Sequence, residues 1–406
     1  MKIRPFSALR PAPEYASAIA SLPYDVMNRE EALEMAAGNP DSFLHVVRSE
    51  IDCPPETDLH CPDVYKKAND NLERLIREKK LIREEAPSFY LYRQIMGKHR
   101  QTAVVACCSI DDYSNGRILR HEKTRRDKED DRTEHILTLR AQTGQIFLCY
   151  QDRETVKRLV EEESAADPLY DFTSPDGIRH TVWRAVRTAE IAAAFQDIPY
   201  AYIADGHHRT AASFRAGMEM RKQGAAEDAE SNFMMACLFP ASELSILPYH
   251  RCVRDLNGLT SRDFLLRANE CGFSISSIPF PEVSLDHSCS VRLPEGWYRF
   301  SWPITEQQAA DPIARLDVTR LQEDLLAPIL NIKDPRIDPR IYFVGGIRGT
   351  TALEEDVAKG NAAVAFAMRP TTIQQMMAIA DTGETMPPKS TWFEPKLRSG
   401  LLIHTF

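Results

Sequence analysis

Short apolar runs alternate along this chain with stretches in which apolar residues recur every three or four positions. The first pattern predicts strands and the second predicts helices, because side chains alternate between faces in a strand but return to one face every 3.6 residues in a helix. We expect strands at 43–47, 88–93, 103–110, 202–205 and 341–344. Two helices are expected, one with Tyr65, Ala68, Leu72, Leu75 and Ile76 on one face and one with Val318, Leu321, Leu325 and Ile329.

The alternation of strands and helices predicts a mixed α/β fold, and no internal repeat, low-complexity tract or flexible linker interrupts it. We expect a turn at 111–116 and irregular structure in two Pro-rich segments, 279–303 and 386–395. A length of 406 residues favours two or three domains. We expect a large first region at 1–256 and a smaller inserted α/β subdomain at 257–345. A C-terminal segment at 346–406 is expected to pack back on the first region.

Composition points to a protein with a large core, since 43% of the residues are hydrophobic. No apolar run is long enough to cross a bilayer, and the first residues carry positive charge without a continuous apolar stretch, so we expect a cytoplasmic protein. The nine cysteines include no Cys-x-x-Cys pair, which predicts reduced, structural thiols. The net charge of −9 argues against a general nucleic-acid binder, because such proteins bind through basic surfaces.

The junction at 202–213 is the strongest candidate for a functional site. An apolar strand ends at Asp205-Gly206 and continues directly into a helical pattern that begins with His207, His208 and Arg209. The first free N–H groups of a helix, together with the helix dipole, favour a bound phosphate. The arginine and the histidines, joined by the hydroxyl of Thr210, supply further donors. The alternative is an ordinary Asp-Gly turn whose histidines only cap the helix.

A second candidate is His121-Glu122, which follows the apolar pair Ile118-Leu119. A carboxylate near a phosphate site can accept the proton of an attacking hydroxyl, the usual requirement for a general base in phosphoryl transfer. The alternative is structural, because residues 120–134 contain six Lys or Arg and six Asp or Glu. Such a balanced run is typical of a solvated helix face, with Glu122 and Arg126 paired four residues apart.

Weaker candidates lie elsewhere in the chain. Lys389, Ser390 and Thr391 follow two prolines and could contact a nucleotide or pyrophosphate, although the upstream glycines of a P-loop are absent and an ordered surface turn explains them equally well. We expect Asp25 to cap a helix starting near residue 29 rather than to contact a ligand. Four further candidates have no supporting sequence pattern around them. We expect Arg132 and His135 at the surface, and His250 with Arg251 could line a cleft.

The motif Ala204-Asp205-Gly206-His207-His208-Arg209 resembles the phosphate-binding motif of the ParB/sulfiredoxin-like superfamily, in the form found in its free L-serine kinases. His121-Glu122 is similar to the His-Glu pair of those kinases, whose glutamate is the catalytic base. The resemblance implies a ParB/sulfiredoxin-like phosphate-binding core in the first region, with large insertions and a C-terminal extension. Sulfiredoxins have a cysteine where this chain has His207, so a sulfiredoxin reaction is not expected.

More of the chain resembles a long, largely uncharacterised bacterial and archaeal family labelled ParB- or SpoOJ-like. The segments that resemble it are Pro23–Val26, Asn39–Val46, Phe89–Gln94, Ile246–Arg251 and Met386–Lys396. Two features depart from the compact serine kinases. Glu122 and Asp205 are 83 residues apart, and the roughly 150 residues after Arg251 have no counterpart there.

Together these observations predict a phosphotransferase that acts on the hydroxyl of a small metabolite, with free L-serine as the first choice of substrate and Mg²⁺ with ATP, ADP or pyrophosphate as cofactor and donor. Glu122 would be the base, Asp205 would orient serine or Mg²⁺, and the residues that follow Asp205 would hold the phosphoryl group. We expect no nucleic-acid or membrane partner and allow for a homo-oligomer. The alternatives are a ParB-like nucleotide switch or DNA-partition protein, and a binder of a phosphorylated metabolite without turnover.

Overall fold

A computed structural model describes residues 1–406, which divide into two units. The first contains Met1–Leu244 and Pro395–Phe406, and the second contains Ser245–Glu394. No helix combines the length and apolar character needed to cross a membrane.

The units divide the chain at other positions than the predicted boundaries at 256 and 345. Residues 346–394 belong with the preceding segment because β19 (Val364–Ala367) pairs with β14 (Tyr249–Val253) and β16 (Ser288–Leu293) in one sheet. Only the last twelve residues, 395–406, return to the first unit.

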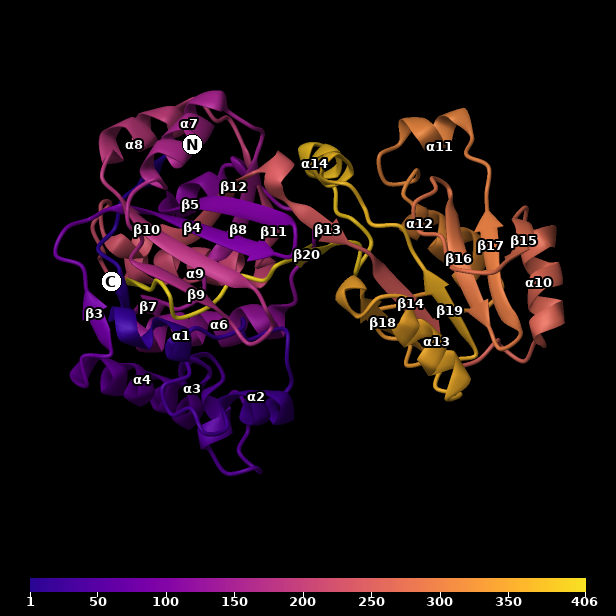
Figure 1. Ribbon diagram of the computed structural model, residues 1–406, viewed down its shortest axis with the longest axis horizontal. Coiled ribbons are helices and arrows are strands. Elements are labelled where there is room, and N and C mark those ends of the chain that lie inside the picture. Colours follow the sequence, from indigo (N-terminus) through magenta and orange to yellow (C-terminus); the bar gives the residue numbers. More distant parts are fainter. The chain divides into compact units, whose positions relative to one another are not determined.

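The first unit is built on a mixed nine-stranded sheet with the order β6-β11-β8-β12-β5-β4-β10-β9, in which β1 also pairs with β5. Figure 1 shows α7 and α8 on one side of this sheet and α1 to α4 with α6 on the other. Because both faces are covered, every residue of the interior strand β8 is buried. The strands are β1 (Ile3–Arg4), β4 (Phe89–Met96), β5 (His99–Ser109), β6 (Ile118–Leu119), β8 (Ile146–Tyr150), β9 (Tyr170–Thr173), β10 (Arg179–Ala185), β11 (Ala201–Asp205) and β12 (Phe233–Pro240).

Helices of the first unit pack through separate apolar clusters. One cluster joins α7 and α8 to the sheet, and another joins α1 to α4. The helices are α1 (Ala16–Ile19), α2 (Arg29–Ala36), α3 (Leu44–Val47), α4 (Pro62–Arg77), α5 (Ile110–Ser114), α6 (Arg126–Leu139), α7 (Glu154–Glu163), α8 (Thr188–Gln196) and α9 (His207–Lys222). Two short ribbons complete the unit, β2 (Leu9–Pro11) with β3 (Leu81–Arg83) and β7 (Ala141–Gln142) with β21 (His404–Thr405).

The second unit contains an antiparallel six-stranded sheet with the order β15-β17-β16-β19-β14-β18. A separate ribbon of β13 and β20 pairs the segment that enters this unit with the segment that leaves it. The remaining strands are β13 (Ser245–Leu247), β15 (Ser274–Ile278), β17 (Gly296–Ser301), β18 (Ile341–Gly345) and β20 (Trp392–Glu394). The helices are α10 (Ser261–Glu270), α11 (Glu306–Ala310), α12 (Asp317–Leu321), α13 (Thr351–Ala358) and α14 (Ile373–Asp381).

The predicted mixed α/β class is confirmed, and so are most of the long elements. The expected strands at 88–93, 103–110 and 341–344 correspond to β4, β5 and β18, and the two expected helices correspond to α4 and to α12 with the π-helical turn Gln322–Leu326. The nine cysteines are free thiols, six of them buried. Burial raises the pKa of the Cys149 and Cys252 thiols to about 12, as expected for structural cysteines.

Three local predictions were wrong. The apolar run 43–47 is not a strand, because its last four residues form α3. The turn expected at 111–116 is largely the short helix α5, whose start is capped by the Ser109 side chain. The Pro-rich segment 279–303 contains the hairpin of β16 and β17, because its prolines lie before, between and after these strands.

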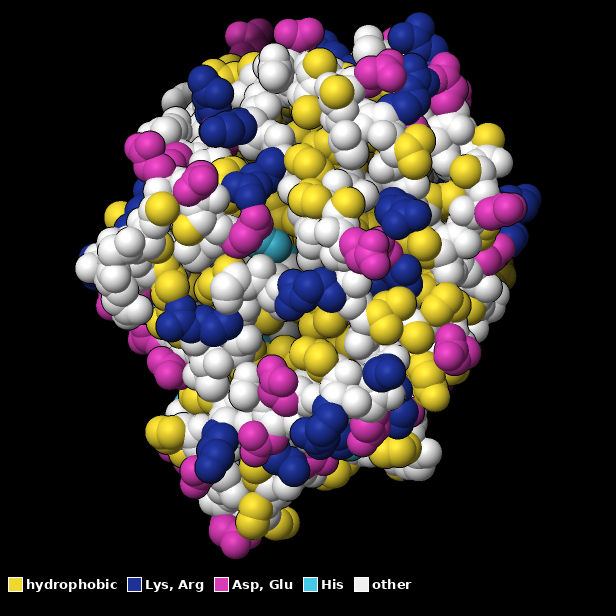
Figure 2. Space-filling view, turned by 90° about the vertical axis from the view of Figure 1, so that its left-hand side faces the viewer, with side chains coloured by type: hydrophobic (Ala, Val, Ile, Leu, Met, Phe, Trp, Pro, Cys, Tyr) yellow, Lys and Arg dark blue, Asp and Glu magenta, His cyan; other side chains and the backbone are white.

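The charged run 120–134 also differs from the prediction. Helix α6 begins at Arg126, so Glu122 precedes the helix, and Arg126 forms an ion pair with Asp130 one turn further on. Figure 2 shows basic and acidic side chains interspersed on one face of the molecule. No continuous basic stripe is seen on that face.

Candidate functional site

Two parallel strands bring the two sequence motifs together. Strand β6 pairs with β11 in parallel, with Ile118 opposite Ala201. Because parallel strands end at the same edge of a sheet, the residues after β6 meet those after β11. The rings of His121 and His207 lie edge to face with centroids 4.5 Å apart, and Glu122 Oε2 lies 3.9 Å from His207 Nδ1.

Gly206 forms the sharp turn from β11 into α9. Its φ of +89° lies in the left-handed region that favours glycine. A Cβ atom at this position would lie 3.1 Å from Cζ of Arg209, so the absence of a side chain also lets the guanidinium approach the turn. No side chain caps the helix start, and the Thr210 N–H is the first to bond back, to the Gly206 carbonyl at 2.9 Å. The preceding N–H groups of the first turn therefore have no partner within the helix.

A buried charge cluster surrounds this turn. Asp205 Oδ1 accepts a hydrogen bond from the Gly206 N–H at 2.9 Å, and Oδ2 lies 3.4 Å from Lys396 Nζ and 3.6 Å from Arg209 Nη2. Burial alone would raise the pKa of Asp205, but the two cations hold this pKa well below its usual value. Asp205 is therefore a carboxylate at neutral pH and fixes both cations beside the start of α9.

Arg209 is directed toward several acceptors at once. Its Nη1 donates to the Gln145 carbonyl at 2.5 Å, and Nη2 lies 3.9 Å from Asp25 Oδ2. Its Nε is buried without a hydrogen-bond partner. An unsatisfied buried donor on a cation is a natural point of attachment for an anion or an ordered water.

The histidines of the site are held neutral by burial. Burial lowers the pKa of His121 to about 4, against the opposing effect of a hydrogen bond with the Ile203 backbone. Burial also lowers the pKa of His207 well below its usual value, and the neighbouring His121 lowers it further. Both imidazoles can therefore donate a hydrogen bond or bind a metal without carrying charge at neutral pH.

Two residues of the motif have local structural partners. His208 Nε2 accepts a hydrogen bond from the Arg125 N–H at 3.1 Å and so attaches the loop before α6 to the start of α9. The Thr210 hydroxyl is buried and donates to the Gly206 carbonyl at 3.0 Å. These contacts occupy Nε2 of His208 and the hydroxyl proton of Thr210.

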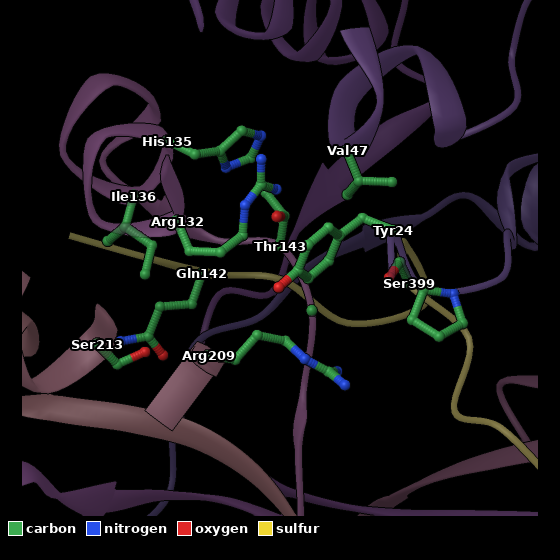
Figure 3. A pocket seen from close by; sticks show the side chains of 12 residues that line it. Tyr24, Val47, Arg132, His135, Ile136, Gln142, Thr143, Arg209, Ser213 and Ser399 are labelled. Carbon is green, nitrogen blue, oxygen red and sulfur yellow. The ribbon is translucent and has the colours of Figure 1, made fainter. Parts of the chain in front are cut away.

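Arg132 lies in a small cavity next to Arg209 and not at the surface as expected. The cavity has a volume of about 30 Å³, and its lining includes Tyr24, Arg132, His135, Arg209 and Ser399. Figure 3 shows the Tyr24 side chain between the two arginines, and the Arg132 guanidinium lies 4.3 Å from the centre of the Tyr24 ring. His135 is also buried, and its Nε2 lies 3.0 Å from the Val46 carbonyl. The polar lining suits one or two ordered waters.

The remaining candidates belong to the second unit. His250 and Arg251 are buried in β14, where His250 Nδ1 accepts a hydrogen bond from the Met368 N–H at 3.1 Å. Lys389 Nζ lies 5.4 Å from the centre of the Tyr249 ring, and the Ser390 hydroxyl donates to the Pro387 carbonyl at 2.6 Å. In the same loop Thr391 follows Ser390, whose carbonyl accepts a hydrogen bond from Thr371. These contacts describe an ordered turn.

Sequence reasoning missed three contributors to the site. Asp25 is not the helix cap that we expected, because Asn28 caps α2 with its side chain, and Asp25 faces Arg209 instead. Lys396 supplies the second cation, and the carbonyl of Gln145 holds Arg209. Lys396 lies inside a segment recognised by resemblance, but no local pattern distinguishes it from other lysines.

Comparison with protein families identifies one match. The model of a family described as "Protein of unknown function (DUF1015)" matches residues 3–319. The expected assignment to a ParB- or SpoOJ-like family is therefore wrong. No curated protein matches the sequence.

Solved structures with a similar arrangement are distant. A free serine kinase in complex with AMP is 14% identical, with 73% of this chain and 91% of that chain covered and a TM-score of 0.36. SbnI with a C-terminal truncation, from Staphylococcus aureus, is 10% identical over 74% of this chain and 87% of that chain, with a TM-score of 0.40. A conserved hypothetical protein from Pyrococcus furiosus is 13% identical over 73% and 94%, with a TM-score of 0.34. Similarity at this level supports no inference about activity.

Proposed function

We propose a function from the site itself, since the chain belongs to the family described as "Protein of unknown function (DUF1015)". The protein is a phosphotransferase that moves a phosphoryl group from a nucleotide or pyrophosphate to the hydroxyl of a small metabolite. The observation that carries this proposal is the uncapped start of α9, where Arg209 has a buried, unsatisfied Nε and Lys396 lies beside Asp205. Helix N–H groups and an arginine are the usual means of holding a transferred phosphate.

Each residue has a distinct role in this reaction. The first-turn N–H groups of α9 and Arg209 bind the phosphoryl group and stabilise the charge that develops on it. Asp205 is a positioning residue, because its two oxygens are already directed at the Gly206 N–H and at the two cations. The neutral imidazole of His207 can donate a hydrogen bond to a phosphate oxygen.

Glu122 is the proton acceptor in this proposal. Its side chain is 45% exposed, so a substrate hydroxyl can reach it, and its carboxylate lies beside His207 at the start of α9. The hydroxyl oxygen bonds to phosphorus while the bond from phosphorus to the leaving oxygen breaks, and Glu122 takes the hydroxyl proton. L-serine is the first acceptor to test, because residues 121–122 and 204–209 resemble motifs of free L-serine kinases.

Magnesium would accompany a nucleotide donor, since it neutralises phosphate charge and needs only one or two protein carboxylates. Asp25, with a side chain 34% exposed, fits that need better than Asp205, whose oxygens are already engaged, and it leaves Glu122 to act as the base. The phosphate groups are what the site recognises, so ATP, ADP and pyrophosphate are all donors to test.

The test is formation of O-phospho-L-serine. The purified chain is incubated with Mg²⁺, L-serine and each donor in turn, and the product is measured by mass spectrometry, with the reverse reaction started from phosphoserine. Glu122→Gln should lower turnover by at least about 100-fold. Glu161→Gln, an exposed glutamate of α7, is the matched control and should leave turnover unchanged.

Two results would count against the proposal. Absence of product in both directions with every donor, from a folded chain, would refute phosphotransfer to serine. A thermal shift with phosphoserine in that same case would favour a binder of a phosphorylated metabolite. Near-normal turnover by Glu122→Gln would remove Glu122 from the reaction while leaving the phosphate site in place.

A further inference from the structure

Three potential metal ligands converge at the edge of the sheet where β6 and β11 end. His121, Glu122 and His207 each offer one donor atom, and these atoms lie within 4.8 Å of one another. Donors on one tetrahedral zinc ion lie about 3.3 Å apart, as bond lengths near 2.0 Å require. Glu122 Oε2 lies 3.9 Å from His207 Nδ1, and its side chain, which is 45% exposed, has room to move closer.

The two histidines are held in place by the fold. His121 and His207 are only 2% and 6% exposed, and their rings pack edge to face. His121 forms a hydrogen bond with the backbone of Ile203 in β11. A second hydrogen bond of this kind is typical of metal-binding histidines, because it fixes the orientation of the ring and leaves the other nitrogen for the metal.

His207 provides an independent observation. Its Nε2 is buried without a hydrogen-bond partner, although buried polar atoms almost always have one. Its Nδ1 lies 3.9 Å from Glu122 Oε2, which is too far for a hydrogen bond but suitable for two atoms that share an ion. An ion shared with Glu122 would bind Nδ1 and make Nε2 the protonated nitrogen of the neutral ring.

We propose that His121, Glu122 and His207 form a binding site for one divalent transition-metal ion. Two imidazoles and one carboxylate suit zinc, iron, cobalt or nickel, whereas magnesium and calcium prefer oxygen ligands alone. Three protein ligands leave coordination positions for water or for an oxygen of an anion at the start of α9.

This inference goes beyond phosphotransfer and does not depend on it. It also has a consequence for that reaction, because a carboxylate bound to a metal ion is a weaker proton acceptor. If Glu122 is the base, the metal-loaded chain should turn over more slowly than the metal-free chain with Mg²⁺. If phosphotransfer is absent altogether, the metal site is unaffected.

Zn²⁺ is the probe for the first experiment. Untagged full-length protein is stripped with a chelator and dialysed against buffered Zn²⁺, and bound zinc is measured by mass spectrometry and calorimetry. Wild-type protein should bind about one high-affinity ion per chain. His207→Asn and Glu122→Gln should each weaken this binding by at least about 10-fold, whereas His287→Asn, which changes a half-exposed histidine of the second unit, should bind as wild type.

Thermal melting in chelator shows whether each variant is folded, and Glu122→Gln keeps the test decisive if a buried histidine variant does not fold. Cobalt(II) provides a second readout, because the visible spectrum of bound cobalt depends on its ligands and should change in Glu122→Gln. The proposal is overturned if folded wild-type protein binds no zinc at micromolar concentrations. It is equally overturned if folded Glu122→Gln binds zinc with wild-type affinity and gives an unchanged cobalt spectrum.

Discussion

Gly217 fixes how closely α9 approaches a neighbouring turn, and its substitution by alanine is a test of the packing that positions the site. A Cβ atom at Gly217 would lie 2.5 Å from the Ser231 carbonyl oxygen and 2.6 Å from Cδ1 of Ile110. The helix starts at the candidate site and passes this contact ten residues later. We therefore expect Gly217→Ala to destabilise the protein.

Two opposing effects determine the size of this change. Alanine favours a helix interior over glycine by about 1 kcal/mol, whereas inserting a methyl group into a filled space costs roughly 1–3 kcal/mol. The Ile110 methyl can rotate away, but the Ser231 oxygen belongs to the backbone and moves only with its turn. The cost of the methyl group should therefore lie in the upper part of its range, at about 2–3 kcal/mol, which gives a net loss of about 1–2 kcal/mol. For a unit of this size that loss lowers Tm by roughly 2–8 °C.

Both contributions can be measured by calorimetry and urea unfolding. The proteins compared are wild type, Gly217→Ala, Ile110→Val and the double variant. Ile110→Val removes Cδ1, so a large recovery of stability in the double variant would identify the side chain as the obstacle. We expect only a small recovery, because the contact with the carbonyl remains. A Tm for Gly217→Ala equal to or above that of wild type would refute the reasoning.

Three further predictions concern single groups. Burial alone would raise the pKa of Asp131, but an adjacent arginine and a tyrosine hydroxyl lower this pKa to about 2. The resulting contribution to the free energy of unfolding, about 2 kcal/mol, is present above the unfolded pKa near 4 and is lost as the pH falls toward 2. The stability lost between pH 5 and pH 3, measured by urea unfolding, should be smaller in Asp131→Asn than in wild type. Lys396→Met leaves Asp205 with one cation fewer and should lower the free energy of unfolding by about 1–3 kcal/mol, and an unchanged urea midpoint would contradict this. Gly400→Ala places a Cβ atom 2.7 Å from Cγ of Phe43 at a φ of +88°, so its Tm should fall by several degrees, and a wild-type Tm would exclude the clash.

The sequence pattern correctly predicted the elements whose structure depends on residues that are close together in the chain. Strand β11 and helix α9 were correctly predicted from an apolar run that changes at Asp205-Gly206 into helical spacing. The strand predicted at 43–47 was wrong because a short run of four apolar residues and His45 fits a buried strand and a buried helix equally well, and only packing against α4 decides between them. The prolines between 279 and 303 were misinterpreted because a proline bounds a strand as often as it breaks one.

The composition of the site was harder to predict because most of its contacts join distant segments. The cation beside Asp205 comes from Lys396, 191 residues later, and the second carboxylate near Arg209 comes from Asp25. Charge alone does not distinguish these residues among the 50 Lys and Arg and the 59 Asp and Glu of the chain. They become recognisable only when the C-terminal segment and the segment before α2 are placed against the end of β11.

The parallel pairing of β6 with β11 has the greatest consequence for function, and spacing could not reveal it. It places Glu122 beside His207 across 85 residues of sequence, so one carboxylate is available both to a substrate proton and to a metal ion. These two uses compete, since a metal ion bound to the carboxylate withdraws electron density from it and makes it a weaker proton acceptor. Turnover should therefore be measured first on chelator-treated protein with Mg²⁺ and then with added Zn²⁺. A rate that falls as one zinc ion binds would place both functions on Glu122, whereas a rate independent of bound zinc would separate the metal ion from the base.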